Sequence, residues 1–282
     1  MATYTEHRHL SQDGLSLYYR AYGDPLAAAT PILCLPGLTR NSKDFHRLAR
    51  RLSPARRIVC PDYRGRGRSD YATDPKSYHP VVHINDIRHL MAVEGLHHVV
   101  VIGTSFGGFL AMGMALAVPS VLRAVVLNDV GPEVSEAGLS RIMDYVGRDN
   151  PQPDWASAVA ETKRLFATLS LKTDEEWLGS ARATWREGED GLLHFDWDTR
   201  LAGAVSRARR ELDSWSLFRG ISRIPVLTVR GELSDVLSPD TMQHMAREHP
   251  DLIFVTVPGC GHPPSLSEAI AVEALDDFLS GY

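Results

Sequence analysis

The 282-residue sequence has few cysteines, no long apolar run and no excess of basic residues. Its three cysteines, Cys34, Cys60 and Cys260, are an odd number without regular spacing, which excludes a disulfide framework and favours a reducing compartment. No apolar window approaches the length that spans a bilayer, and the first ten residues lack the apolar stretch of a signal peptide. We therefore expect a cytoplasmic protein.

The charge balance argues against nucleic acid as a partner. The formal net charge is -5, and arginine-rich stretches at 47–57 and 207–210 are expected to be solvated helix faces. The sequence leaves self-association open, so a homo-oligomer is compatible with it. The expected partner is a small molecule, with no role for nucleic acid or a membrane.

Short apolar runs alternate with helical patterns at both ends of the chain. Strands are expected at 15–22, 32–35, 58–60, 99–102, 121–128, 226–230 and 253–257, with 5–10 as an antiparallel edge partner of the first. Helices are expected at about 42–52, 81–94, 106–118, 239–249 and 266–279. This alternation predicts an α/β fold with a mostly parallel central sheet flanked by helices.

The alternation stops after Pro132. Residues 133–214 are predicted to form helices without clear strands, at 139–146, 155–169 and 175–186. We therefore predict a core domain of residues 1–132 and 215–282, and a helical cap (lid) inserted at 133–214. All five tryptophans lie in or at the edge of this insertion: Trp155, Trp177, Trp185, Trp197 and Trp215. They suit an apolar lid, with one or two expected to touch a ligand and the others to join the inserted helices.

The most informative segment runs from Val99 to Phe109 and reads V-V-V-I-G-T-S-F-G-G-F. A buried strand there leads through a glycine-bracketed serine into a buried helix, the context in which a sharp turn exposes the serine oxygen. Gly103 and Gly107 flank the serine where a side chain would collide with the neighbouring strand or helix. Ser105 is the candidate nucleophile, and an ordinary strand-to-helix turn is the alternative.

A nucleophilic serine needs a histidine base at the carboxyl edge of the sheet. His262 fits best, because it follows the strand at 253–257 in a glycine-rich loop just before the last helix. His244 and His249 lie within or at the end of a predicted helix, where a solvent-facing role is expected.

The base in turn needs an acid that holds its tautomer. We choose Asp235, four residues beyond Gly231 in the loop after the strand at 226–230. Asp129, at the end of the strand that follows the nucleophile helix, is the serious competitor and could share or replace the role of Asp235. Glu232 is a weaker candidate.

The chain order Ser105, Asp235, His262 resembles that of the α/β-hydrolase superfamily, particularly its capped serine esterase-like members. The resemblance covers nearly the whole chain: the G-T-S-F-G turn, the acid after the penultimate strand, the G-H before the last helix, and the cap. The segment D-Y-R-G-R-G-R-S at 62–69 also looks like the D-x-x-G-x-G-x-S turn of these members.

The resemblance implies an oxyanion hole formed by the backbone N–H groups of Leu38 and Phe106. Pro36 stands where family members often have a histidine, but Leu38 keeps its own N–H.

Two weaker signals involve charged side chains. Arg64, Arg66 and Arg68 would attract a substrate carboxylate if their loop borders the pocket. His79 and His83 have the i, i+4 spacing of metal ligands, but without a third ligand a polar helix face is the favoured interpretation. No cofactor and no metal are implied.

We therefore predict a serine hydrolase that cleaves a small or medium carboxylic ester through an acyl-serine intermediate. Lactonases, thioesterases, amidases and carbon-carbon bond hydrolases use the same triad and stay open as alternatives. A small-molecule receptor on the same fold is the alternative outside catalysis.

Overall fold

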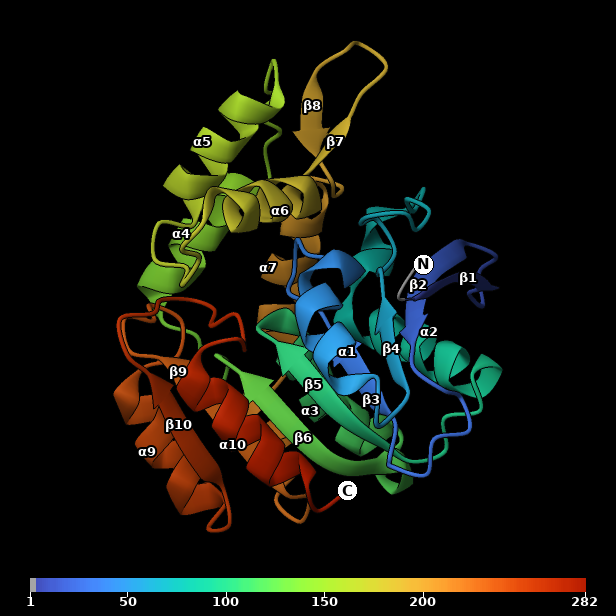
Figure 1. Cartoon of the computed structure of the whole chain (residues 1–282), viewed down its shortest axis with the longest axis vertical. Helices are drawn as coiled ribbons and strands as arrows, with labels where there is room; N and C mark the ends of the chain where they lie inside the picture. The colour runs from blue at the N-terminus through green and yellow to red at the C-terminus, as the bar shows by residue number, and fades with distance from the viewer. Residues whose placement is uncertain (1–3) are drawn as a thin grey trace.

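An eight-stranded sheet forms the centre of the computed structural model, which describes residues 4–282. The strands are β1 (Thr5–Leu10), β2 (Ser16–Tyr22), β3 (Ile32–Leu35), β4 (Ile58–Pro61), β5 (Val99–Thr104), β6 (Leu122–Asn128), β9 (Val226–Gly231) and β10 (Ile253–Val257). Their order is β1-β2-β4-β3-β5-β6-β9-β10 (Figure 1). The pairs β1–β2 and β2–β4 are antiparallel, and every other pair is parallel. The predicted α/β fold with a mostly parallel sheet is confirmed.

Helices cover both faces of this sheet because its strands are apolar on both sides. In β5, Val99 and Val101 contribute to one buried cluster and Val100 and Ile102 to the other, as the two-residue period of a strand requires. The helices α2 (Pro80–Val93), α3 (Phe106–Ala117), α8 (Ser214–Arg219) and α9 (Pro239–Glu248) cover the first face. The helices α1 (His46–Leu52) and α10 (Ala269–Leu279) cover the second. Short 3-10 turns at Ser42–Phe45, Pro75–Tyr78 and Pro119–Val121 precede α1, α2 and β6.

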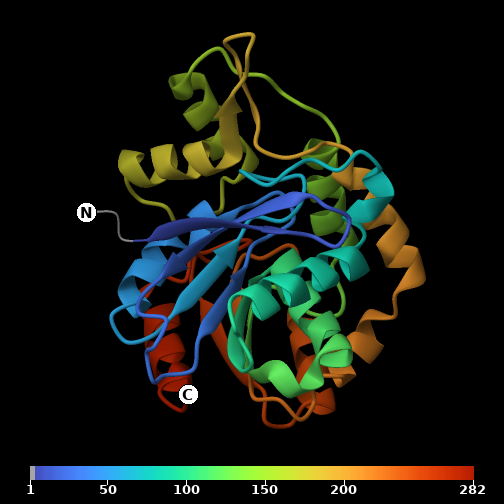
Figure 2. The same ribbon diagram turned by 90° about the vertical axis from the view of Figure 1, so that its right-hand side faces the viewer.

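Most of the segment predicted as a cap, residues 133–214, lies beyond one end of the sheet, above it in Figure 1. It contains α4 (Glu136–Val146), α5 (Trp155–Leu165), α6 (Asp174–Thr184), β7 (Trp185–Glu187), β8 (Leu193–Phe195) and α7 (Leu201–Glu211). The expectation of no strands was wrong, because β7 and β8 pair as an antiparallel hairpin, seen at the top of Figure 2. Three-residue strands are too short to show a period of two in the sequence.

Two of the tryptophans are packed inside the cap. Trp185 and Trp197 are buried on either side of Phe195, with ring centroids 4.3 and 4.0 Å from it. Of the residues described, no tryptophan lines the main cavity, so the expectation that one or two contact a ligand is not supported.

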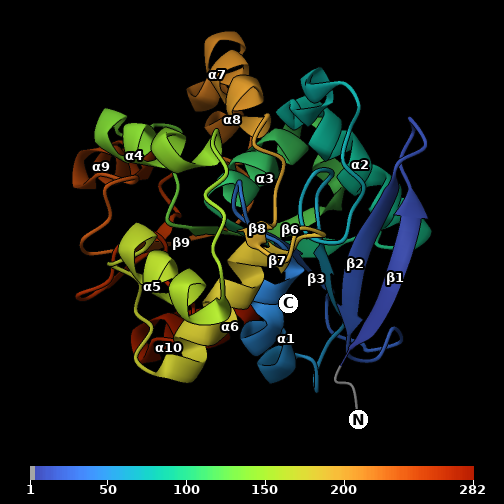
Figure 3. The ribbon, with the colours of Figure 1, turned by 90° about the horizontal axis from the view of Figure 1, so that it is seen from above.

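Viewed from above, α4, α5 and α6 lie over the half of the molecule that holds α9 and α10, away from β1 and β2 (Figure 3). The carboxyl ends of β3, β5, β6 and β10 lie beneath the cap, and the segments that follow them supply the candidate site. Among residues 4–282, no helix is both long and apolar enough to cross a lipid bilayer.

Candidate active site

Ser105 occupies the turn between β5 and α3 in a strained conformation. Its φ of 51° and ψ of -115° are rare for a residue with a side chain. The two flanking glycines make the turn feasible: a Cβ on Gly103 would lie 2.4 Å from the α3 backbone, and one on Gly107 would lie 2.0 Å from the carbonyl oxygen of Leu35 in β3. The predicted collision at both glycines is confirmed, and the turn presents the serine side chain at the sheet edge.

Ser105, His262 and Asp129 form a continuous hydrogen-bonded chain. Nε2 of His262 lies 3.0 Å from Oγ of Ser105, and Nδ1 lies 2.8 Å from Oδ2 of Asp129. Asp129 is completely buried, and its second oxygen accepts a hydrogen bond from the backbone N–H of Gly231 at 3.1 Å. The carboxylate is thus held on both oxygens, and it orients the imidazole toward the serine.

Asp129, not Asp235, is the hydrogen-bond partner of His262, so choosing Asp235 as the histidine's partner was wrong. The Asp235 carboxylate instead receives hydrogen bonds from Nε and Nη2 of Arg141 in α4, at 2.5 and 2.7 Å. Asp129 reaches the histidine because it directly follows β6, where a φ of 56° turns its side chain toward the loop after β10. Asp tolerates this left-handed conformation better than most residues. The sequence identified Asp129 as a candidate, because it ends the strand that follows the nucleophile helix, but did not select it over Asp235.

The other candidates for the acid and base have structural roles. Oε2 of Glu232 accepts a hydrogen bond from the N–H of Gly259 at 2.7 Å. His249 is buried, with Nε2 2.9 Å from the carbonyl oxygen of Ile224, contrary to the solvent-facing role expected for it.

One predicted oxyanion donor, Phe106, follows Ser105 in the chain as the first residue of α3, and the other, Leu38, lies in the turn after β3, the strand that pairs with β5. Within residues 4–282, neither N–H donates to a protein acceptor, as the role requires. Their role as an oxyanion hole stays a prediction.

Two side chains that the sequence analysis did not connect with this loop hold it in place. The hydroxyl of Tyr63 donates to the carbonyl of Pro36 at 3.2 Å, and Nε of Arg66 donates to the carbonyl of Leu38 at 2.7 Å. The guanidinium of Arg66 also lies 5.8 Å from the centre of the Phe106 ring. Arg66 therefore contacts both residues that carry the predicted donors.

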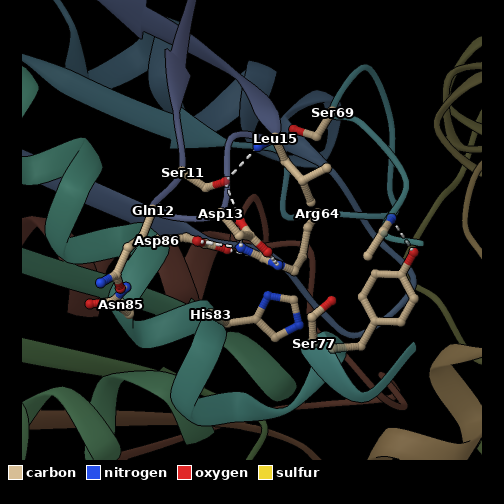
Figure 4. Close-up of polar contacts among 12 residues, drawn as sticks. Ser11, Gln12, Asp13, Leu15, Arg64, Ser69, Ser77, His83, Asn85 and Asp86 are labelled. Carbon is tan, nitrogen blue, oxygen red and sulfur yellow. Dashed lines mark hydrogen bonds and ion pairs between the residues drawn. The ribbon is translucent and has the colours of Figure 1, made fainter. Parts of the chain in front are cut away.

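The arginines at 64–68 do not border the cavity, so they are not placed to attract a substrate carboxylate there. Arg64 is buried between the carboxylates of Asp86 and Asp13 (Figure 4). Arg68 pairs with Glu6 near the edge of the sheet. Arg66 is fully buried and pairs with no carboxylate among the described residues, and burial lowers its pKa to about 10.

His83 is not part of a polar helix face, which corrects that interpretation. It is fully buried in α2 beside Arg64 (Figure 4), and its Nε2 lies 3.3 Å from Nη1 of Arg66. Burial, followed by the charges of Arg66 and Arg64, holds the pKa of His83 well below its usual 6.5. His79 instead caps α2 through its side chain. In the described part of the chain, no group of three or more His, Cys, Asp or Glu side chains is arranged to hold a metal ion.

A cavity of about 330 Å³ opens onto Ser105 and His262. Much of its apolar wall comes from the cap, through Ile142, Tyr145, Phe166, Leu169 and Leu171. Arg40, in the loop after β3, Arg47, in α1, and Arg141, in α4, add three guanidinium groups that the sequence analysis did not assign to the site. The cavity therefore combines an apolar chamber with charged groups near a serine and its histidine base.

Comparisons with known proteins agree with this architecture. Residues 32–275 match the family model described as "Alpha/beta hydrolase family". The chain is 33% identical over 272 residues to a 3-hydroxybutyrate-oligomer hydrolase of Cupriavidus necator, covering 93% of this chain and 92% of that one. It is 27% identical to a 2-(acetamidomethylene)succinate hydrolase of Mesorhizobium japonicum over 88% of this chain and 87% of the relative. A crystal structure of an alpha/beta hydrolase from Novosphingobium aromaticivorans superposes with a TM-score of 0.92 at 41% identity, over 100% of both chains.

Proposed function

Because the chain belongs to the alpha/beta hydrolase family, we propose that it is a serine hydrolase that cleaves carboxylic esters through an acyl-Ser105 intermediate. The observation that carries the proposal is the hydrogen-bonded chain from Ser105 through His262 to the buried Asp129. A serine hydroxyl in contact with an imidazole, which is itself oriented by a carboxylate, is the arrangement that acyl transfer requires.

In the first half of the reaction, Nε2 of His262 removes the Ser105 proton as Oγ attacks the ester carbonyl. The negative charge that develops on the carbonyl oxygen is stabilised by the N–H groups of Leu38 and Phe106. The C–O bond to the alcohol then breaks, and the imidazolium gives its proton to the leaving oxygen. Asp129 stabilises the positive charge on His262 while that proton is held.

In the second half, His262 removes a proton from water, which attacks the acyl-Ser105 carbonyl. The carboxylic acid leaves and Oγ of Ser105 regains a proton from Nε2. A water molecule reaches the acyl group from the cavity that opens onto both side chains. We propose that the cap acts as the lid of this cavity, since it contributes much of the apolar wall.

The names of the relatives support hydrolysis as the reaction, but they differ in the substrate. One is named for 3-hydroxybutyrate oligomers and another for 2-(acetamidomethylene)succinate. For this chain we propose esters with small or medium acyl groups, because an apolar chamber of about 330 Å³ holds an acyl group of that size.

The test is a panel of 4-nitrophenyl esters from acetate to decanoate, with lactones, thioesters and amides alongside. Ser105→Ala is compared with wild type and with Ser222→Ala, a control at an exposed serine outside the cavity. We expect Ser105→Ala to lower kcat by at least about 10⁴-fold, while the control retains wild-type activity. Turnover by Ser105→Ala within tenfold of wild type would contradict the proposal. So would wild-type protein that hydrolyses nothing in the panel, and a single stoichiometric burst without turnover would favour a receptor.

A further inference from the structure

Two of the three arginines that line the cavity, Arg40 and Arg141, are each held by a carboxylate along the same edge of the guanidinium group. Nε and Nη2 of Arg40 donate to Asp44 at 2.7 and 2.6 Å. Nε and Nη2 of Arg141 donate to Asp235 in the same way, at 2.5 and 2.7 Å. Two parallel hydrogen bonds fix the plane of each guanidinium, so both cations are oriented before any ligand enters.

Arg40 and Arg141 differ in the N–H groups that their carboxylate partners leave unused. Nη1 of Arg40 donates to the hydroxyl of Thr184 at 2.6 Å, which uses part of its outer edge. Nη1 of Arg141 meets no acceptor among the described residues, and the side chain is 36% exposed. Arg141 therefore presents an unused edge formed by Nη1 and the second N–H of Nη2. The two parallel N–H bonds of such an edge match the two oxygens of a carboxylate.

The surroundings of Arg141 also favour a negative ligand. Tyr145 lies one helical turn further along α4 and lines the same cavity, and burial raises the pKa of its phenol, which therefore stays protonated as a donor. The cavity lining contains the basic side chains of Arg40, Lys43, Arg47 and Arg141 but only two acidic ones, Asp44 and Glu176. This local excess of positive charge contrasts with the negative net charge of the whole chain.

Asp235 has a clear role in this arrangement. Its hydrogen bonds from Arg141 hold the pKa of the Asp235 carboxyl below its usual value, so it stays ionised and keeps the guanidinium in place. Asp235 occupies one edge of the guanidinium and leaves the other for a ligand. The side chain that the sequence suggested as the triad acid is therefore a positioning residue for a cation in the cavity.

We propose that the substrate is an ester with a free carboxylate, which binds the unused edge of Arg141 while the ester carbonyl lies at Ser105. The inference rests on the proposed function and adds the charge of the substrate to it. The carboxylate-binding site lies on the cap side of the cavity, because Arg141 and Tyr145 both belong to α4.

The experiment compares two esters of equal acyl length, mono(4-nitrophenyl) glutarate and 4-nitrophenyl pentanoate. The measured quantity is the ratio of their kcat/KM values, anionic over neutral, in wild type and Arg141→Gln. The matched control is Arg164→Gln, because Arg164 is also in the cap and pairs with Glu161 through Nε and Nη2 but does not line the cavity. We expect the ratio to fall about ten- to a hundredfold in Arg141→Gln, the usual effect of losing a charged hydrogen-bond pair, and to stay at the wild-type value in Arg164→Gln.

A ratio that stays within twofold of wild type in folded Arg141→Gln would overturn the inference, even if both esters are hydrolysed. If wild type hydrolyses neither ester, the proposed function fails, and binding decides the inference separately. Titration calorimetry of Ser105→Ala with monomethyl glutarate and dimethyl glutarate should then show preference for the monoanion, and Ser105→Ala/Arg141→Gln should lack it. Equal binding of the two compounds by Ser105→Ala would overturn the inference.

Discussion

Replacing Asp129 with asparagine should nearly abolish activity by reversing the histidine tautomer. Oδ1 of Asp129 accepts a hydrogen bond from the N–H of Gly231, while Oδ2 faces Nδ1 of His262. In Asp129→Asn the N–H of Gly231 still requires an oxygen, so the amide NH₂ must face Nδ1. An NH₂ there donates to Nδ1 and forces the ring proton onto Nε2. The imidazole then cannot accept the proton of Ser105.

The expected loss is about 10⁴-fold in kcat, or about 5 kcal/mol of transition-state stabilisation, the size of the same change in a well-studied triad. The backbone tolerates the substitution, because asparagine also adopts the positive φ of 56° found at this position. Activity on 4-nitrophenyl butyrate is measured alongside the thermal unfolding midpoint, so that a loss of folding is recognised.

Asp235→Asn is the matched comparison, because it changes the other candidate for the acid in the same way. It removes the carboxylate that pairs with Arg141 and leaves the contact between Asp129 and His262 intact. We expect it to lower kcat on the neutral ester by less than about tenfold. A loss near 10⁴-fold in Asp235→Asn, with a small effect in Asp129→Asn, would refute this assignment of the acid.

Two further predictions concern the buried polar groups behind the site. Arg66→Lys should lower kcat about ten- to a hundredfold with little change in KM, because lysine lacks the planar fork that contacts Leu38 and Phe106 at once. Arg64→Lys should lower the unfolding midpoint without that selective effect, and an equal loss of kcat in both variants would contradict the role of Arg66. His83 has a pKa below 6.5 in the folded protein, so its contribution to stability is complete above pH 6.5 and is lost as the pH falls below that value. When the pH is lowered from 7.5 to 5.5, the free energy of unfolding in urea should fall by about 1.4 kcal/mol less in His83→Phe than in wild type. An equal fall in the two proteins would count against a neutral buried His83.

The sequence was most informative where the chemistry is local. The nucleophile turn could be predicted because the strand, the serine and the flanking glycines are consecutive, and each glycine has a steric reason within a few residues. The strands of the core were predictable for a similar reason, since runs such as 99–102 are apolar at every position and buried on both faces.

The choice between Asp129 and Asp235 could not be made from the sequence. Both follow parallel strands at the same edge of the sheet, so strand order alone leaves them equivalent. The distinction arises from the positive φ at Asp129 and from Arg141, which lies in the inserted cap and attracts Asp235. An interaction between residues 94 positions apart has no local signal in a single sequence.

The polar groups of the cavity could not be predicted either, because the contacts that bring them together are also long-range in the sequence. Arg40 and Arg141 are far apart in the sequence, and each resembles an ordinary surface residue until the cap brings them to one cavity. Arg66 was noticed as a possible ligand for substrate, but its hydrogen bond with Leu38 makes it a support for the loop instead.

The most direct test of the central claim is covalent labelling of the nucleophile. Wild-type protein is treated with a fluorophosphonate, and intact mass and peptide mass spectrometry then locate the adduct, with Ser105→Ala and Asp129→Asn treated in parallel. The account predicts one adduct per chain on Ser105, none in Ser105→Ala and a strongly slowed reaction in Asp129→Asn. An unlabelled Ser105 in folded wild-type protein, or an adduct that persists in Ser105→Ala, would contradict it.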